Sequence, residues 1–116
     1  MAGRVRRILV VEDESLVAML LEDVLTDLGC TIAGPAANAA EALALVARGG
    51  LDYALLNVNL GHGATSFAVA DALKAMGVPF AFVTGYGIEG VRPDLRDAPV
   101  ISKPVDVAAL AKLLHG

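Results

Sequence analysis

The stretch YALLNVNLG, residues 53 to 61, carries the clearest structural signal in the chain. Its first four residues form a continuous apolar run, whereas a strand that faces water on one side alternates apolar and polar residues. The run therefore predicts a strand from Tyr53 to Leu56 that is covered on both faces, as in a parallel sheet between helices. Asn57 and Asn59 follow where this strand ends, so polar groups lie at that edge of the sheet.

On either side of this stretch, four more apolar runs of strand length alternate with segments in which apolar residues recur at helical spacing. The predicted strands cover residues 8–11, 31–34, 53–56, 80–83 and 100–102, and the predicted helices cover residues 15–28, 38–48, 66–76 and 106–114. This alternation indicates the α/β fold class, a doubly wound parallel sheet of five strands. Residues 85–93 hold three glycines and a proline, so a helix there should be short or mobile.

The ends and buried faces of the helices are also predicted. Gly29 stands where a left-handed helix cap is needed, and Asn38 followed by Glu41 resembles a capping box. The residues at helical spacing, expected on the core-facing stripes, are Val17, Leu20, Leu21, Val24, Leu25 and Leu28, then Val69, Ala70, Leu73 and Met76, and finally Val107, Leu110, Leu113 and Leu114.

Length and composition restrict the class of protein. A chain of 116 residues fits one domain, 1–116, and with 56% apolar and 19% charged residues it is too hydrophobic to be disordered. Its apolar stretches are shorter than the roughly 20 residues that span a bilayer, and the basic segment 1–7 precedes too short an apolar run for a signal peptide. We therefore expect a cytoplasmic protein without membrane contact. The net charge of -4 disfavours direct DNA binding, and the lone Cys30 is expected to pack in the core.

Polar side chains are expected to meet at one edge of the predicted sheet. The carboxyl ends of parallel strands share an edge, and ligands bind there in open α/β sheets. Four of the predicted strands are followed by Glu12, Asp13 and Glu14, by Asn57 and Asn59, by Thr84, and by Lys103. Paired carboxylates facing amide oxygens suit Mg²⁺, which takes oxygen ligands. A lysine and a threonine hydroxyl opposite them suit phosphoryl oxygens.

This constellation resembles the receiver domain of two-component response regulators. The resemblance covers the whole chain through four motifs, VVEDE at 10–14, LLNVNLG at 55–61, VTG at 83–85 and SKP at 102–104. It implies a flavodoxin-like sheet with strand order 2-1-3-4-5 and helices on both faces. It also implies a stand-alone signalling module of a phosphorelay rather than an enzyme.

The resemblance implies a role for each site residue. Asp13 matches a direct Mg²⁺ ligand, and Glu12 matches an acid that acts through water. The backbone carbonyl of Asn59 would be a further metal ligand. Thr84 matches the hydroxyl that moves onto the phosphoryl group, and Lys103 matches the lysine that pairs with that group. The family pattern therefore assigns a function to four of the predicted strand ends.

The run PFAFVTGYG, residues 79–87, is similar to the FATGUY subgroup of receivers, with Val83 in place of the alanine. This subgroup often lacks the aromatic switch residue of the fifth strand, and Val100 occupies that position here. Tyr86 either takes over the reporting role or is a half-buried loop aromatic. The resemblance further implies a cis peptide bond before Pro104.

Position 57 departs from the family pattern, because Asn57 stands where receivers have the aspartate that accepts phosphate. A neutral amide offers no comparable nucleophile and forms no acyl phosphate. The chain as written is therefore expected to stay unphosphorylated, to bind Mg²⁺ weakly, and to leave Lys103 without its nearest anionic partner. Asn57 is either a substitution that holds a working receiver unphosphorylated or the native residue of a pseudo-receiver that acts as a binding module. The retained residues around it favour the first explanation.

The resemblance also implies the partners. These are a sensor histidine kinase or phosphotransferase protein, and a downstream protein bound through the region around residues 86–115. A nucleotide- or flavin-binding enzyme fits less well, because Glu12 and Asp13 would repel a phosphate after the first strand. A metal-dependent phosphatase needs a nucleophile, which Asn57 does not supply, and the loop residue His62 is expected to be exposed.

Overall fold

The computed structural model describes residues 6–115, so most of the basic segment 1–7 lies outside the described residues. The elements in chain order are β1 (Arg7–Val11), α1 (Ser15–Asp27), β2 (Thr31–Ala36), α2 (Ala39–Arg48), β3 (Tyr53–Asn57), α3 (Phe67–Ala75), β4 (Phe80–Thr84), the 3₁₀ helices η1 (Gly87–Gly90) and η2 (Pro93–Leu95), β5 (Val100–Ser102) and α4 (Val107–His115). Among residues 6–115, no helix has the length and apolar character needed to cross a bilayer.

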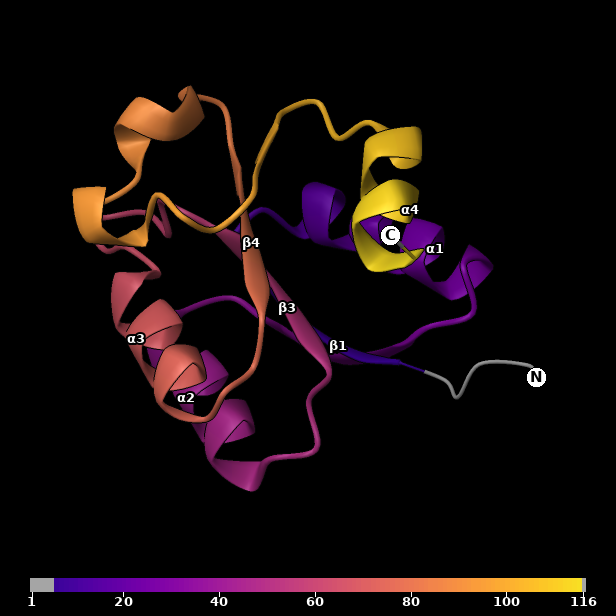
Figure 1. The fold of residues 1–116 in the computed structure, drawn as a ribbon, viewed down its shortest axis with the longest axis horizontal. Coiled ribbons are helices and arrows are strands. Elements are labelled where there is room, and N and C mark those ends of the chain that lie inside the picture. The colour runs from indigo at the N-terminus through magenta and orange to yellow at the C-terminus, as the bar shows by residue number, and fades with distance from the viewer. Residues whose placement is uncertain (1–5, 116) are drawn as a thin grey trace.

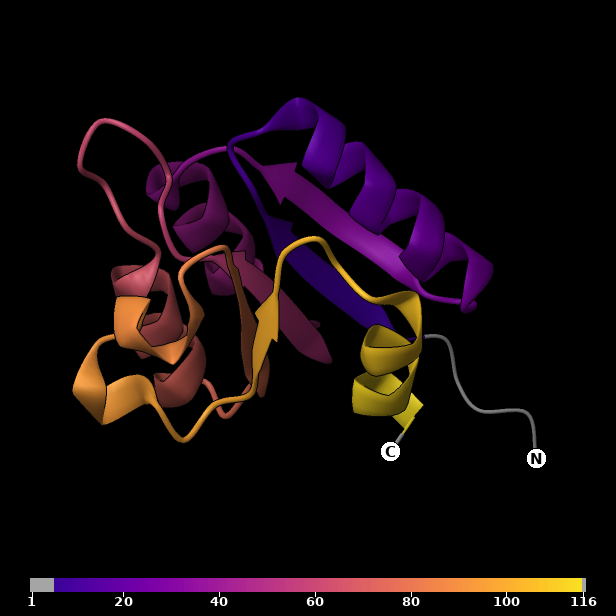
Figure 2. The same cartoon turned by 90° about the horizontal axis from the view of Figure 1, so that it is seen from above.

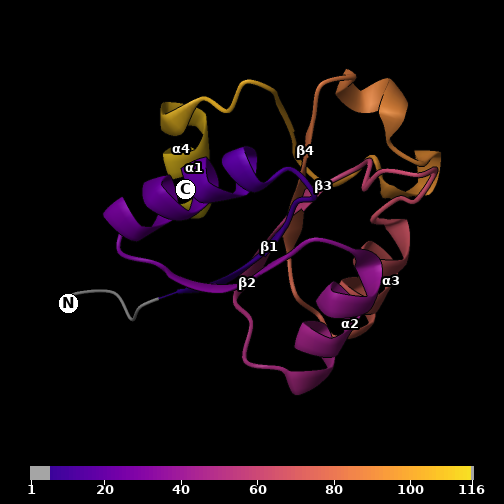
Figure 3. The same cartoon turned by 180° about the vertical axis from the view of Figure 1, so that it is seen from behind.

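The five strands form one parallel sheet in the order β2-β1-β3-β4-β5, which confirms the predicted fold. Helices α1 and α4 cover one face of the sheet, and α2 and α3 cover the other (Figures 1 and 3). Neighbouring residues of β3 point to opposite faces, because side chains alternate along a strand. Leu55 packs in the core beneath α1 and α4, whereas Leu56 packs in the core beneath α2 and α3. Both faces are therefore buried, as the continuous apolar runs indicate.

Local signals set the helix ends as predicted. The side chain of Asn38 accepts a hydrogen bond from the backbone N–H of Glu41 at 2.9 Å, and the Glu41 carboxylate accepts one from the N–H of Ala37 at 2.9 Å. Gly29 adopts a φ of 86° just after α1, a conformation that residues with a side chain rarely take. The lone Cys30 is buried, as expected.

The prediction that the core-facing stripes are buried is wrong for three residues. Leu20, Met76 and Val107 are about half exposed. Met76 is the C-cap residue beyond the last turn of α3, and Val107 is the first residue of α4, so neither is held against the sheet. Leu20 lies on a helix that is apolar around most of its circumference, and Leu21 and Leu25 occupy its buried side. Helical spacing alone did not select the buried side.

The segment between β4 and β5 contains the two short 3₁₀ helices instead of an α-helix, in line with its glycine content. Seen from above, this segment lies beside α3, on the side of the molecule away from α4 (Figure 2). Val91 and Leu95 anchor it in the same core as α3. The Arg92 guanidinium fixes it from outside by pairing with Asp71 of α3 and with Asp94, each at 2.6 Å. The segment is thus tied to the sheet by few buried residues.

Candidate functional site

A polar pocket lies where the carboxyl ends of β1, β3, β4 and β5 meet. Its volume is ≈ 450 Å³, and its lining residues are Asp13, Glu14, Asn57, Asn59, Gly61, Thr84, Gly85, Tyr86 and Lys103. Glu12 lies next to Asp13 and contacts both Asn57 and Lys103. The structure therefore brings together every predicted site residue, although they come from four strands.

Glu12 is the buried acid of this pocket, with a relative exposure of 2%. Its Oε2 accepts hydrogen bonds from the Asn57 side-chain amide at 2.9 Å and from the Glu14 backbone N–H at 3.2 Å. Its Oε1 lies 3.1 Å from Lys103 Nζ. Burial raises the pKa of the Glu12 carboxyl above its usual value, whereas the Glu14 hydrogen bond and the nearby Lys103 charge oppose that rise. The partners of Glu12 thus favour its ionised form, whereas its burial opposes that form.

Asn57, at the end of β3, is 7% exposed and stands at the centre of the pocket. Its Nδ2 donates to Glu12 Oε2 at 2.9 Å, to Asp13 Oδ1 at 3.0 Å and to the backbone carbonyl of Asn59 at 2.6 Å. The Asn59 carbonyl thus faces the pocket, while the Asn59 side chain is exposed. Asn57 is the residue through which the β1 and β3 sides of the pocket are connected.

Without an aspartate at position 57, Lys103 pairs with two other carboxylates. Its ammonium group, on a side chain that is 20% exposed, lies 3.1 Å from Glu12 Oε1 and 3.8 Å from Glu14 Oε1. The peptide bond between Lys103 and Pro104 is cis, as the resemblance implied. The sequence placed Glu14 among the polar residues at this edge of the sheet but assigned it no partner. Its backbone N–H and its carboxylate contact Glu12 and Lys103 because the chain turns into α1 there.

Thr84 is buried at the end of β4, and its hydroxyl accepts a hydrogen bond from the backbone N–H of Tyr86 at 3.0 Å. The Thr84 carbonyl accepts a further hydrogen bond from the Lys103 N–H at 2.9 Å. The Tyr86 side chain is 75% exposed, so it is not the half-buried aromatic that one interpretation predicted. Thr84 therefore joins the pocket to the loop that carries an exposed tyrosine.

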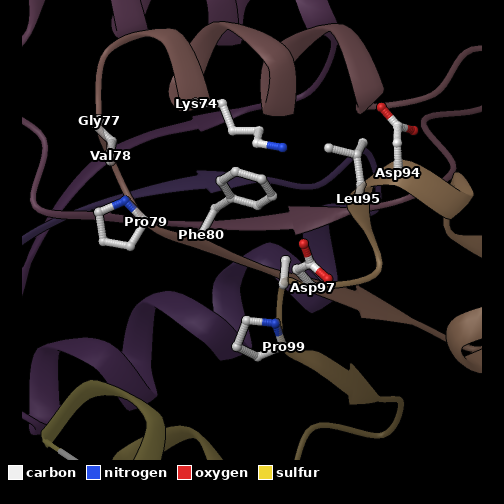
Figure 4. A pocket seen from close by; sticks show the side chains of 10 residues that line it. Lys74, Gly77, Val78, Pro79, Phe80, Asp94, Leu95, Asp97 and Pro99 are labelled. Atoms are coloured by element: carbon white, nitrogen blue, oxygen red, sulfur yellow. The ribbon is translucent and has the colours of Figure 1, made fainter.

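A second pocket, of ≈ 410 Å³, lies at the opposite end of the sheet, where β4 and β5 begin (Figure 4). Phe80, Leu95 and Pro99 line it together with Lys74, Asp94 and Asp97. It shares no lining residue with the polar pocket. The sequence-predicted site residues therefore all belong to the other end of the sheet.

Comparison with known proteins agrees with this architecture. A sequence profile of the response regulator receiver domain matches residues 8–115. The chain belongs to this family, whose members are signalling proteins.

Three relatives cover nearly the whole chain. The phyllosphere-induced regulator PhyR of Methylorubrum extorquens is 34% identical over 97% of this chain, which spans 43% of PhyR. The solution structure of SdrG from Sphingomonas melonis is 46% identical, covers 96% of this chain and 94% of the SdrG chain, and superposes with a TM-score of 0.85. The crystal structure of PhyR from Brucella abortus is 26% identical with a TM-score of 0.81, and covers 96% of this chain and 46% of the PhyR chain. The chain thus spans less than half of the PhyR proteins.

Receiver domains generally bind Mg²⁺, and the donors of this pocket fit that ion only in part. Among residues 6–115, no three His, Cys, Asp or Glu side chains are grouped to hold a metal. Asp13 and the Asn59 carbonyl offer oxygens that suit a hard cation, and Glu12 Oε2 contacts the same Asn57 nitrogen as they do. The Asn57 amide, however, directs N–H groups at these oxygens, and an N–H group is no metal ligand.

Proposed function

We propose that this chain is a phosphorelay receiver whose pocket is complete except for the phosphate acceptor, so that it is not phosphorylated as written. The observation that carries the proposal is the position of Asn57 among Glu12, Asp13 and the Asn59 carbonyl. An aspartate there would present a nucleophilic oxygen beside the acidic pair, whereas the amide nitrogen is occupied as a donor. Thr84 and Lys103 also line the pocket, where they would offer a hydroxyl and an ammonium group to a phosphoryl group.

The variant Asn57→Asp tests this proposal. With acetyl phosphate and Mg²⁺, we expect a mass increase of about 80 Da, one phosphoryl group, on the variant and none on the unmodified chain. Asn59→Asp is the matched control, because it makes the same chemical change on an exposed side chain two residues away, and it should gain no mass. An unreactive Asn57→Asp variant that is folded would refute the assignment.

Mg²⁺ is the proposed cofactor, with Asp13 and the Asn59 carbonyl as ligands, Glu12 acting through water, and Asn57 weakening the site. A divalent cation there would neutralise charge on a phosphoryl oxygen. Asp13 brings a full negative charge, whereas Asn57 brings none, so the affinity should be lower than with an aspartate. Titration with Mg²⁺ should raise the thermal stability of Asn57→Asp more than that of the unmodified chain.

The proposed output is binding of a downstream protein by the region around residues 86–115, in the cytoplasm. Three apolar side chains of this region are exposed, Tyr86 and Ile88 after β4 and Val107 at the start of α4. The Thr84 hydroxyl now accepts a hydrogen bond from the Tyr86 N–H, and moving this hydroxyl into the pocket would break that bond. This gives a physical route from the site to the surface. Similarity of residues 79–87 to the FATGUY receivers supports Tyr86 as the reporter. In Asn57→Asp, phosphorylation should change hydrogen exchange in residues 85–95; unchanged exchange there would contradict this route.

A native pseudo-receiver is the second candidate. It is favoured by the Asn57 amide, whose N–H groups are fully used in hydrogen bonds to the pocket. The sequence of the encoding gene distinguishes the two, because an aspartate codon at position 57 would exclude a native asparagine.

The proposed source of the phosphoryl group for Asn57→Asp is a sensor histidine kinase or a phosphotransferase protein.

A further inference from the structure

One nitrogen atom serves three acceptors at the centre of the polar pocket. Asn57 Nδ2 lies 2.9 Å from Glu12 Oε2, 3.0 Å from Asp13 Oδ1 and 2.6 Å from the Asn59 carbonyl oxygen. An amide nitrogen carries only two hydrogens, so at least one of them is shared between acceptors. This is the coordination expected around a small cation rather than around an ordinary surface amide.

The chemistry of the acceptors fixes the orientation of the Asn57 amide. Two of the three atoms belong to carboxylates and the third to a carbonyl, so with the carboxylates ionised none of them carries a hydrogen to donate. If the amide were reversed, Oδ1 would face three oxygens at hydrogen-bonding distance with no proton between them. A buried polar atom left in that way is strongly unfavourable, and Asn57 is 7% exposed. Without a cation, Nδ2 therefore points inward.

A cation reverses this preference. Mg²⁺ requires oxygen ligands near 2.0–2.1 Å and close to octahedral geometry, which an N–H group cannot supply. The ion would need the same oxygens of Asp13 and Asn59 that Nδ2 now occupies. Lys103 adds a second obstacle, because its ammonium group already neutralises Glu12 at 3.1 Å.

We propose that the Asn57 amide is an internal substitute for the metal ion, which holds the acidic pocket closed to divalent cations until the amide turns over. The inference rests on the proposed receiver function and adds how this site is regulated. It differs from the simpler view that Asn57 is a weak metal ligand lacking one charge. If the amide is only a weak ligand, removing it loses an oxygen donor and lowers metal affinity. If the amide blocks the site, removing it frees two carboxylates and raises the affinity.

The variant Asn57→Ala separates these two effects without changing the net charge. Titration with Mn²⁺, followed by its electron paramagnetic resonance, should give a dissociation constant about ten-fold lower for Asn57→Ala than for the unmodified chain, the scale on which neighbouring hydrogen bonds change metal affinity. The double variant Asp13→Asn/Asn57→Ala should lose this gain, which would assign it to the polar pocket. Equal or weaker binding by Asn57→Ala, or a gain that survives the Asp13 change, would overturn the inference.

A measurement on the unmodified chain covers the case in which Asn57→Ala does not fold. The side-chain NH₂ protons of Asn57 should exchange with solvent at least about ten-fold more slowly than those of the exposed Asn59, and addition of Mg²⁺ should speed up the Asn57 exchange as the amide turns over. Similar exchange rates for both residues, or no response to Mg²⁺, would refute the inference. The proposed function fails separately, namely when Asn57→Asp binds Mg²⁺ but takes no phosphoryl group from acetyl phosphate.

Discussion

Replacement of Lys103 by methionine tests the ion pair at the base of the polar pocket. Methionine keeps the apolar stem of the side chain and removes the ammonium group, so Glu12 Oε1 loses the partner that lies 3.1 Å away. Breaking a fully buried ion pair costs about 3–5 kcal/mol, because it leaves an uncompensated charge out of water. The Glu12 side chain is fully buried, but Lys103 is 20% exposed and water reaches its side of the pair. We therefore expect Lys103→Met to lower the free energy of unfolding by about 2–3 kcal/mol.

Other contacts of Glu12 and Lys103 limit the expected loss in the free energy of unfolding. Glu12 Oε2 keeps its hydrogen bonds from Asn57 and from the Glu14 backbone in the variant, so only Oε1 of the carboxylate loses its partner. The second ion pair of Lys103, with the Glu14 carboxylate at 3.8 Å, is largely solvated and contributes at most about 1 kcal/mol. Glu14→Gln is accordingly the matched control, and it should change the stability by about 0.5 kcal/mol or less.

Urea unfolding at neutral pH, followed by far-ultraviolet circular dichroism, measures both variants. The double variant Glu12→Gln/Lys103→Met removes the buried charge together with its partner, so its loss should be smaller than the sum of the two single losses by about 1 kcal/mol or more. If Lys103→Met and Glu14→Gln have the same effect, or if the double variant is additive, then Glu12 does not need Lys103 and the reasoning is refuted.

Two further predictions concern the core and the η1–η2 segment. Phe82→Ala should lower the free energy of unfolding by about 3–5 kcal/mol, because a large buried side chain is deleted; Phe82 also packs edge-on against Phe67 and Phe80, at centroid distances of 6.0 Å and 5.6 Å. Leu20→Ala, on the exposed side of α1, should cost much less in the same urea assay, and a comparable loss would contradict the burial. Hydrogen bonds from Arg92 hold the pKa of the Asp94 carboxyl below its usual value, so this group favours folding at pH values above its unfolded pKa and loses that effect as the pH falls. A carbon NMR titration should show the Asp94 pKa rising in Arg92→Gln; an unchanged pKa would show that the ion pair is absent in solution.

Most of the fold followed from local patterns. Continuous apolar runs such as that before Asn57 predicted strands buried on both faces, and the alternation with helical segments predicted the parallel sheet. Asn38 and Gly29 set helix ends by contacts within a few residues, so their signals were readable in the sequence. Val107 and Met76 were misjudged because each lies at a helix end, where spacing does not say whether the sheet still faces the residue.

The sequence by itself predicted that the polar residues after four strands share one edge of the sheet, because the carboxyl ends of parallel strands lie at the same edge. It also shows that an amide, and not a carboxylate, follows the third strand at position 57, since the identity of a side chain needs no structure. Only the tertiary structure decided how these groups pair. Lys103 binds Glu12, and Asn57 turns its N–H groups toward two carboxylates and a carbonyl, because β1, β3 and the loop after β5 bring donors and acceptors from distant parts of the chain within 3.1 Å of each other. Hydrogen-bond direction depends on those distances, which no local pattern encodes.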